Sequence, residues 1–386
     1  MLTYDGAVIG LGAMGSACAY ATARRGLRIV GLDRYVPAHP RSSSFGESRL
    51  IRLAYFEHPS YVPLVREAYE RWHDLEAASG RRVMVRTGVI EAGYPGAPLV
   101  AGSVRAAAEH GVFSEQISPA VVNARFPAFN LPEGWDAVFQ PDAAALLPEQ
   151  AIGLFIAGAQ AHGASIRLHS PVTALEPVGE RVQIVLADGE RIEAAWAVVS
   201  TGAWIADLLP EVATHLHLTR QPLMWFEPLQ PSRVGPDRMP AFLLQTPADL
   251  IYGLPNVCGT GVKAASHLSG GSLSSAEAAR EPVSAGEVEH LRGLLRAYVP
   301  AAAGALVRSS VCLYTRSPDN HFVVGPHPRA PQIVVASPCS GHGFKFASVM
   351  GEILADLAID RTTARPIGLF DIERLMSTGS TNATGQ

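Results

Sequence analysis

Short apolar runs alternate along the chain with stretches in which apolar residues return every three or four positions. The first apolar run starts at about residue 4 and predicts a strand. Small residues occupy 16–25 and are followed by Gly26, which predicts a helix that ends at this glycine. A second apolar run over 28–33 predicts another strand. The chain is therefore expected to open with a strand–helix–strand unit.

The same reasoning predicts elements along the rest of the chain. The clearest amphipathic helix is predicted over 61–79, where Tyr69 and Trp72 share one face and Gly80 follows the last turn. Further helices are predicted over 119–126, 149–162, 284–298 and 345–359. Strands are predicted over 83–92, 165–168, 182–186, 193–199, 221–226, 241–245, 250–254, 307–315 and 333–336.

The order of these elements predicts an α/β protein of two units. A chain of 386 residues is too long for one average domain. Helices and strands alternate at both ends of the chain, whereas the middle is rich in strands, so we expect a discontinuous Rossmann-like cofactor unit and a β-rich substrate unit. The first unit is assigned residues 1–82, 150–216 and 306–386, and the second residues 83–149 and 217–305.

Composition narrows the class of protein. Hydrophobic residues make up 48% and charged residues 17%, which permits a large core, and the net charge of −4 without a Lys/Arg block argues against nucleic acid or a membrane as partner. The four cysteines lie far apart, which favours a reducing compartment. The first strand leaves no room for a signal peptide, and no apolar stretch reaches about 18 residues. We expect a cytoplasmic protein with a frayed tail over 377–386.

The first turn carries a dinucleotide-binding pattern, Gly10-x-Gly12-x-x-Gly15. Gly10 makes the tight turn, Gly12 lets a pyrophosphate approach the backbone, and Gly15 lets the helix pack closely on the strand. The helix start offers unpaired N–H groups to phosphate. Asp33 ends the second strand, where its carboxylate can accept ribose hydroxyls. The pattern predicts a dinucleotide site but does not separate NAD from FAD.

Two other segments carry candidate chemistry. The polar loop 41–52 contains Arg49 and Arg52, which would point roughly the same way if they opened a helix. Near the C-terminus, Cys339-x-x-His342 looks like half a metal site, but the chain contains no matching second pair, so no metal is expected. Cys258 is expected to be a buried structural thiol.

Several motifs in this order resemble one family, the monomeric sarcosine oxidase and N-methyltryptophan oxidase family of FAD-dependent amine oxidases. The resemblance covers nearly the whole chain, and the last two motifs are the most specific. The motifs are Gly10-x-Gly12-x-x-Gly15, Gly46-Glu-Ser-Arg-Leu-Ile-Arg52, Tyr252-Gly-Leu-Pro255, Gly261-Val-Lys263 with His267, Cys312-Leu-Tyr-Thr315 and Ser340-Gly-His-Gly-Phe-Lys345.

The resemblance implies an enzyme that binds FAD, oxidises the C–N bond of secondary α-amino acids to an imine, and reduces O2 to H2O2. It implies a thioether bond from the flavin to Cys312, and Lys263 as the residue that activates oxygen. Arg52 and Lys345 would hold the substrate carboxylate. Arg52 would supply a planar pair of N–H donors and Lys345 a compact positive charge. Tyr252, Tyr314, His267 and Arg49 match the other active-site positions.

The positions expected to contact FAD follow from the same resemblance. They are Gly10, Gly12, Met14, Gly15, Asp33, Arg34, Ser43, Ser44, Arg49, Val172, Thr201, Gly202, Trp204, Cys312, Gly341, Gly343, Phe344 and Lys345. The chain departs from the family in one place: Ser44-Phe45 stands where the sarcosine oxidases have two histidines. Phe45 is therefore expected either to contact a larger or more apolar substrate, such as a cyclic amine, or to serve packing alone.

Alternatives remain open. Cys339 borders the C-terminal glycine segment, Gly341-x-Gly343, and is the second candidate for flavin attachment. A flavoprotein dehydrogenase that passes electrons to a quinone or a protein carrier is the second functional hypothesis. A non-catalytic flavin-binding subunit of an amine-oxidising complex is the third. Retention of Lys263 favours the oxidase over the dehydrogenase, and the Arg52/Lys345 pair argues against the subunit. A monomer is favoured.

Overall fold

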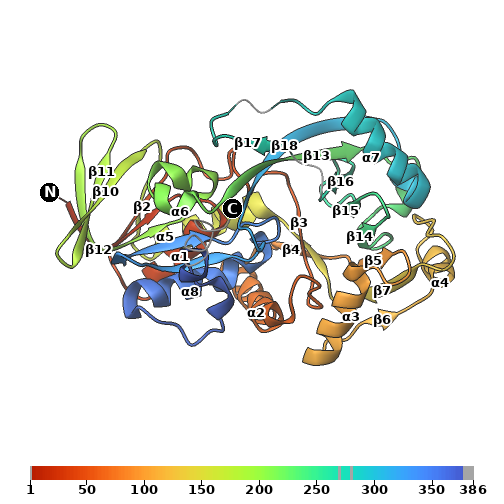
Figure 1. Cartoon of the computed structure of the whole chain (residues 1–386), viewed down its shortest axis with the longest axis horizontal. Coiled ribbons are helices and arrows are strands. Elements are labelled where there is room, and N and C mark those ends of the chain that lie inside the picture. The colour runs from red at the N-terminus through yellow and green to blue at the C-terminus, as the bar shows by residue number, and fades with distance from the viewer. Residues whose placement is uncertain (1, 268–270, 279–280, 377–386) are drawn as a thin grey trace, which may run out of the picture.

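The computed structural model describes residues 2–267, 271–278 and 281–376. It is an α/β structure built on two large sheets, which lie side by side in Figure 1. The first and last parts of the chain (red and blue) meet in one lobe, and most of the middle (orange and teal) forms the other. The predicted α/β class is confirmed. The expected frayed tail, 377–386, lies outside the described residues.

The first lobe is an eight-stranded sheet covered by small-residue helices. Its central strands are parallel and its remaining strands are antiparallel. A Cβ at Gly351 would lie 2.7 Å from the backbone of Ala17, so the small residues allow two helices to pack closely. The parallel strands are β1 (Leu2–Ile9), β2 (Ile29–Leu32), β9 (Ser165–Arg167), β12 (Arg191–Val199) and β20 (Ala330–Ser337). The other strands are β10 (Val172–Val178), β11 (Arg181–Leu186) and β19 (Val323–His327).

The second lobe is a nine-stranded, largely antiparallel sheet. Its strand order is β17-β13-β16-β15-β14-β5-β7-β6, with β18 also paired to β13. The strands are β5 (Val89–Gly93), β6 (Glu115–Gln116), β7 (Asp136–Gln140), β13 (His217–Phe226), β14 (Ala241–Gln245), β15 (Leu250–Leu254), β16 (Val262–Ser266), β17 (Ser272–Leu273) and β18 (Leu306–Arg316). A small third sheet joins β3 (Arg49–Ile51), β8 (Ala144–Leu146) and β4 (Met84–Arg86).

Most predicted helices are confirmed within a few residues. The helices are α1 (Ala13–Arg24), α2 (Val62–Ser79), α3 (Pro98–His110), α4 (Pro119–Arg125), α5 (Pro148–Ala161), α6 (Pro210–Ala213), α7 (Ala285–Tyr298), α8 (Ala347–Asp360) and α9 (Glu373–Met376). Helix α2 ends at Gly80 with φ of 66°, a left-handed conformation that favours glycine. Helix α3 was missed, because its many small residues make the apolar stripe hard to recognise.

Three expectations need correction. The single strand predicted over 83–92 is broken into β4 and β5 at Gly88, whose φ of 68° interrupts an extended chain. Arg49 and Arg52 do not open a helix: β3 is extended, so residues three apart point to opposite sides. Cys258 is exposed rather than buried.

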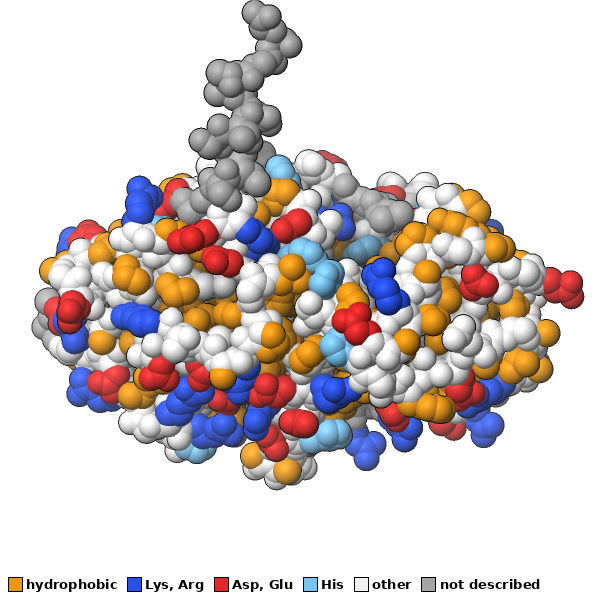
Figure 2. Space-filling view, turned by 60° about the horizontal axis from the view of Figure 1, so that its bottom comes forward, with side chains coloured by type: hydrophobic (Ala, Val, Ile, Leu, Met, Phe, Trp, Pro, Cys, Tyr) orange, Lys and Arg blue, Asp and Glu red, His pale blue; other side chains and the backbone are white. Residues whose placement is uncertain are grey.

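The lobe surfaces mix charges of both signs. Acidic and basic side chains are interspersed over the face shown in Figure 2. Several form ion pairs; Arg365, for example, bridges Glu67 and Asp356. Among the described helices, none is both long and apolar enough to cross a membrane.

Candidate active site

One cavity lies where the carboxyl ends of the parallel strands meet the nine-stranded sheet, and it gathers most of the predicted site residues. At a sheet of this kind, ligands bind beyond the carboxyl ends of the strands. Gly15, Phe45 and Lys263 do not line the cavity. The predicted residues that do are Gly10, Gly12, Met14, Asp33, Arg34, Ser43, Ser44, Arg49, Arg52, Val172, Thr201, Gly202, Trp204, Tyr252, His267, Cys312, Tyr314, Gly341, Gly343, Phe344 and Lys345.

The glycine turn has the geometry that a dinucleotide needs. Gly10 has φ of 86°, and a Cβ at Gly15 would lie 1.8 Å from Gly10 O, so both positions require glycine. Leu11 N donates to Asp33 Oδ2 at 2.6 Å, and this carboxylate keeps lone pairs for further donors. Burial raises the pKa of Asp33. No side chain caps the start of α1 within the described chain, which leaves its N–H groups for a phosphate.

Three buried hydroxyl groups on the cavity wall lack a partner. Ser42 Oγ, Thr201 Oγ1 and Ser337 Oγ have no hydrogen bond to any described residue. An unpaired buried hydroxyl is costly, so such groups indicate a bound polar molecule. Together with the glycine turn, they fit FAD, whose diphosphate, ribose and flavin supply donors and acceptors along its length.

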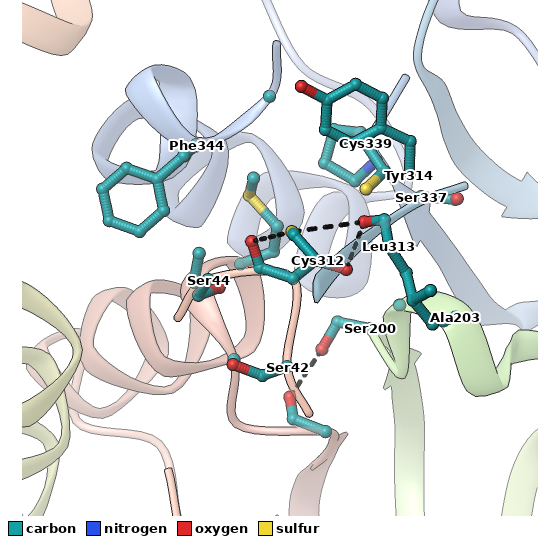
Figure 3. A pocket seen from close by; sticks show the side chains of 18 of the residues that line it. Ser42, Ser44, Ser200, Ala203, Cys312, Leu313, Tyr314, Ser337, Cys339 and Phe344 are labelled. Carbon is teal, nitrogen blue, oxygen red and sulfur yellow. Dashed lines mark hydrogen bonds between the residues drawn. The ribbon is translucent and has the colours of Figure 1, made fainter. Parts of the chain in front are cut away.

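Cys312 lies on β18 and lines this cavity. Its Sγ lies 3.4 Å from Ser43 O, and Ser43 Oγ donates to Leu313 O at 2.9 Å. Figure 3 shows Cys312 between the segment of Ser42 and Ser44 and the labelled Cys339. Both thiols line the cavity, and burial raises the pKa of Cys339. Because β18 pairs with β13, Cys312 belongs to the nine-stranded sheet, although the predicted division assigns 306–386 to the cofactor unit.

Lys263 lies behind the cavity wall and holds a sharp turn. Its Nζ donates to Gly46 O at 2.8 Å and to Ser48 O at 2.6 Å. On the other side of the turn, Glu149 Oε1 accepts from Gly46 N and Glu47 N at 2.8 and 2.9 Å. Burial, with the nearby charge of Arg49, lowers the pKa of Lys263. The turn is thus held between a lysine and a glutamate.

Arg52 is fully buried and already surrounded by acceptors. Its Nε pairs with Glu91 Oε1 at 3.0 Å, its Nη2 with Glu57 Oε2 at 2.7 Å, and its Nη1 donates to Ala54 O. Gln140 donates to the second oxygen of Glu91 at 2.9 Å. Burial raises the pKa of Glu91, although Arg52 opposes the shift. A substrate carboxylate would therefore enter a cluster that already contains two acids.

Lys345 lies at the same end of the cavity, in a network of neutral groups. Its Nζ donates to His342 O at 2.9 Å and to Tyr55 Oη at 3.2 Å. Tyr55 Oη and His342 Nδ1 are 2.7 Å apart, and His342 Nε2 is 3.0 Å from Asn320 O. Burial lowers the pKa of His342 to about 3 and that of Lys345 to about 7, the latter against the opposing charge of Glu57.

The same end has an apolar wall that sequence reasoning missed. It comes mainly from β15, the strand that carries Tyr252, and from its neighbour β14, where Leu243 lies opposite Tyr252; this pairing is not visible in the sequence. The apolar residues of this wall are Phe56, Leu243, Leu250 and Leu254. Glu57 and His342 also line this end and were not predicted as site residues. Burial raises the pKa values of Tyr252 and Tyr314 and lowers that of His267 to about 4. These side chains are thus uncharged near neutral pH.

Comparisons with known proteins agree with this geometry. Residues 5–357 match the family model of FAD dependent oxidoreductases. The chain is 36% identical to a monomeric sarcosine oxidase of Streptomyces avermitilis, covering 97% of this chain and 98% of that protein. It is 32% identical to an N-methyl-L-tryptophan oxidase of Citrobacter koseri, covering 97% and 99%.

Solved structures show the same fold. The open form of NikD, described as an unusual amino acid oxidase essential for nikkomycin biosynthesis, aligns with a TM-score of 0.85 at 25% identity, over 96% of this chain and 98% of that chain. An L-proline dehydrogenase from P. horikoshii has a TM-score of 0.84 at 17% identity, over 98% and 99%. With the full-length relatives, these matches show that the chain belongs to the FAD-dependent oxidoreductases, in the family that contains the monomeric sarcosine oxidases and N-methyl-L-tryptophan oxidases.

Proposed function

We propose that the protein oxidises secondary α-amino acids, N-methylated or cyclic, to imines and transfers the electrons to O2 to give H2O2. The observation that carries the proposal is one cavity that joins a dinucleotide turn to a buried Arg52 and Lys345. FAD, when bound, supplies the electron acceptor for oxidation of the C–N bond. Two relatives named above, a monomeric sarcosine oxidase and an N-methyl-L-tryptophan oxidase, are by name oxidases of such amines.

Arg52 and Lys345 are proposed to bind the substrate carboxylate. A guanidinium offers a planar pair of donors and an ammonium offers a point charge, so together they fix both oxygens. In a buried site such charged hydrogen bonds are strong and select against amines that lack a carboxylate. The apolar wall of Leu243, Leu250 and Leu254 would then receive an apolar substituent of the amine. Contact of the substrate with Phe45 stays a prediction; this side chain is half-buried.

Lys263 is proposed to assist the reaction with oxygen. Reduction of O2 passes through an anion, so a buried cation nearby lowers the barrier. Lys263 is 2% exposed, and its two carbonyl partners hold the amino group in place. Arg49, which donates to the carbonyl groups of Ser43 and Phe45, is proposed to lie beside the flavin.

We further propose that FAD is bound covalently through Cys312. This residue lines the same cavity as the glycine turn and Lys345. The enzyme is proposed to act as a monomer in the cytoplasm. The four cysteines are all free, which is consistent with a reducing compartment.

A screen for H2O2 release tests the function. N-methyl, cyclic and primary amino acids would be offered to the purified holoenzyme in air, and turnover of secondary α-amino acids above primary ones is expected. If a dye is reduced but no H2O2 forms, the protein is a dehydrogenase and the oxidase proposal is wrong. If no amine bleaches the flavin under anaerobic conditions, the protein is not a catalyst of this class.

A further inference from the structure

The chain contains only two lysines, Lys263 and Lys345. All the other residues counted as Lys or Arg are arginines. Both lysines are buried, at 2% and 7% exposure, so the basic side chains seen on the surface in Figure 2 are arginines. Arginine stays charged at every physiological pH, whereas a buried lysine can lose its proton. Lysine thus occurs only at two buried positions near the cavity, where its charge can change.

The hydrogen bonds around Lys345 define which groups donate. Asn320 O can only accept, so His342 Nε2 carries the hydrogen and donates to it. His342 Nδ1 therefore accepts from the Tyr55 hydroxyl. The oxygen of Tyr55 is then free to accept from Lys345 Nζ. The proton positions along this series of hydrogen bonds all follow from the carbonyl group of Asn320, at which the series ends.

This pattern satisfies a neutral lysine completely. A neutral amine has two hydrogens and one lone pair, and the two hydrogens are used by His342 O and Tyr55 Oη. The lone pair is left for the cavity that Lys345 lines. The depressed pKa of Lys345, about 7, agrees with a neutral amine in the empty site above neutral pH. Such a group is a base aimed at the substrate.

We propose that Lys345 is the base that removes the proton from the substrate ammonium when the amino acid binds. The N–H bond of the substrate breaks and a new N–H bond forms on Nζ, so total charge is conserved. The amine becomes neutral, which frees the lone pair needed for oxidation. At the same time Lys345 becomes the cation that holds the carboxylate. This inference rests on the proposed function and adds a proton-transfer step to it.

The geometry of an α-amino acid makes the transfer direct. Its nitrogen is one carbon away from the carboxylate, so a carboxylate bound between Arg52 and Lys345 brings the ammonium close to Nζ. The charged groups around Lys345 are Glu57, Glu91 and Arg52, and the titratable neutral ones are Tyr55, His342 and His267. The pKa of Glu57 is lowered to about 2 by Arg52 despite burial, so this acid does not act as the base.

The test is proton uptake on binding, measured by calorimetry of the holoenzyme in two buffers of different ionisation enthalpy. Cyclohexanecarboxylate has no amine, so Lys345 must take its proton from the solvent, about 0.9 proton at pH 8 and about 0.1 proton at pH 6 for a pKa of about 7. Uptake near zero at pH 8 overturns the inference, and this measurement needs no variant. Equal affinity for cyclohexanecarboxamide would instead overturn the carboxylate clamp of the proposed function.

Variants assign the proton. Lys345→Arg keeps a cation but cannot be a base at neutral pH, so it should bind the carboxylate without proton uptake. Its anaerobic flavin reduction by a zwitterionic substrate at pH 7 should fall at least 100-fold and recover about tenfold per pH unit toward pH 10, where the amine loses its own proton. Lys263→Arg is the matched control and should keep the proton uptake. If uptake persists in Lys345→Arg, another group takes the proton and the inference is wrong.

Discussion

Arg52 and Glu57 form an ion pair inside the cavity, with 2.7 Å between Nη2 and Oε2. Burial acts to raise the pKa of Glu57, but the Arg52 charge outweighs it and lowers this pKa from 4.5 to about 2. Arg52 has a second acid, Glu91, on its other side. The residue proposed to bind a substrate anion is therefore held by two anions of the protein itself.

This pair is expected to stabilise the fold in a pH-dependent way. A carboxyl group with a lowered folded pKa stabilises the protein above its unfolded pKa, and this contribution is lost as the pH falls from 4.5 to about 2. Glu57→Gln should lower the free energy of unfolding at pH 7 by about 3 kcal/mol, and by about half as much at pH 3. Urea unfolding at both pH values measures the difference. A variant as stable as the wild type at pH 7 would contradict the expectation.

Arg52→Met is expected to raise KM for carboxylated amines. Loss of a buried charged hydrogen bond costs about 1.5–3 kcal/mol, or roughly 10- to 150-fold. The matched control is Arg365→Met, which removes an arginine paired with Glu67 and Asp356 instead. Steady-state kinetics with an amino acid and with its methyl ester separate the carboxylate effect from general damage. An unchanged KM for the amino acid would refute the clamp.

Lys263→Met is expected to slow reoxidation of the reduced enzyme by O2 far more than its reduction by substrate. The cation is needed where an oxygen anion forms, and reduction by the amine forms no such anion. A loss of 100-fold or more corresponds to about 2.7 kcal/mol. Stopped-flow spectroscopy follows the flavin in each half-reaction. Lys263→Arg, which keeps a positive charge, should lose less of the reoxidation rate. If the wild type and both variants were reoxidised at the same rate, Lys263 would have no role in the reaction with O2.

Glu149 is expected to stabilise the turn that Lys263 binds. One oxygen, Oε1, accepts both backbone N–H groups, so Glu149→Gln keeps an acceptor in place, whereas Glu149→Ala leaves the two donors without it. The alanine variant should lose about 2 kcal/mol or more of unfolding free energy relative to the glutamine variant. Urea unfolding compares the two. Equal stability would show that the turn does not depend on this contact.

The flavin is expected to stay with the polypeptide after acid precipitation. Cys312→Ser should release it into the supernatant, because serine cannot form the thioether, and Cys339→Ser should retain it. Absorbance of the two fractions measures the partition. Retention by Cys312→Ser together with release by Cys339→Ser would move the attachment to the second thiol, which also lines the cavity.

Local patterns in the chain were sufficient for most of the predicted elements and for the cofactor turn. The spacing of Gly10, Gly12 and Gly15 and the position of Asp33 depend on neighbours in sequence, and the structure confirms that turn. Helix α2 and its terminal Gly80 were predicted for the same reason. Elements without a clear period, such as α3, were missed, and the break at Gly88 required knowledge of its left-handed conformation.

Contacts between distant segments could not be predicted in this way. Glu91 lies on β5 of the nine-stranded sheet, and it pairs with Arg52, which directly follows β3 of the third sheet. Tyr55 and His342 are 287 residues apart in sequence, yet their side chains define the proton positions at Lys345. Residue types and local spacing thus identified the family and the candidate groups. Only the packing of the sheets set which charges and hydrogen bonds surround them, because a charge acts through distance in space and not along the chain.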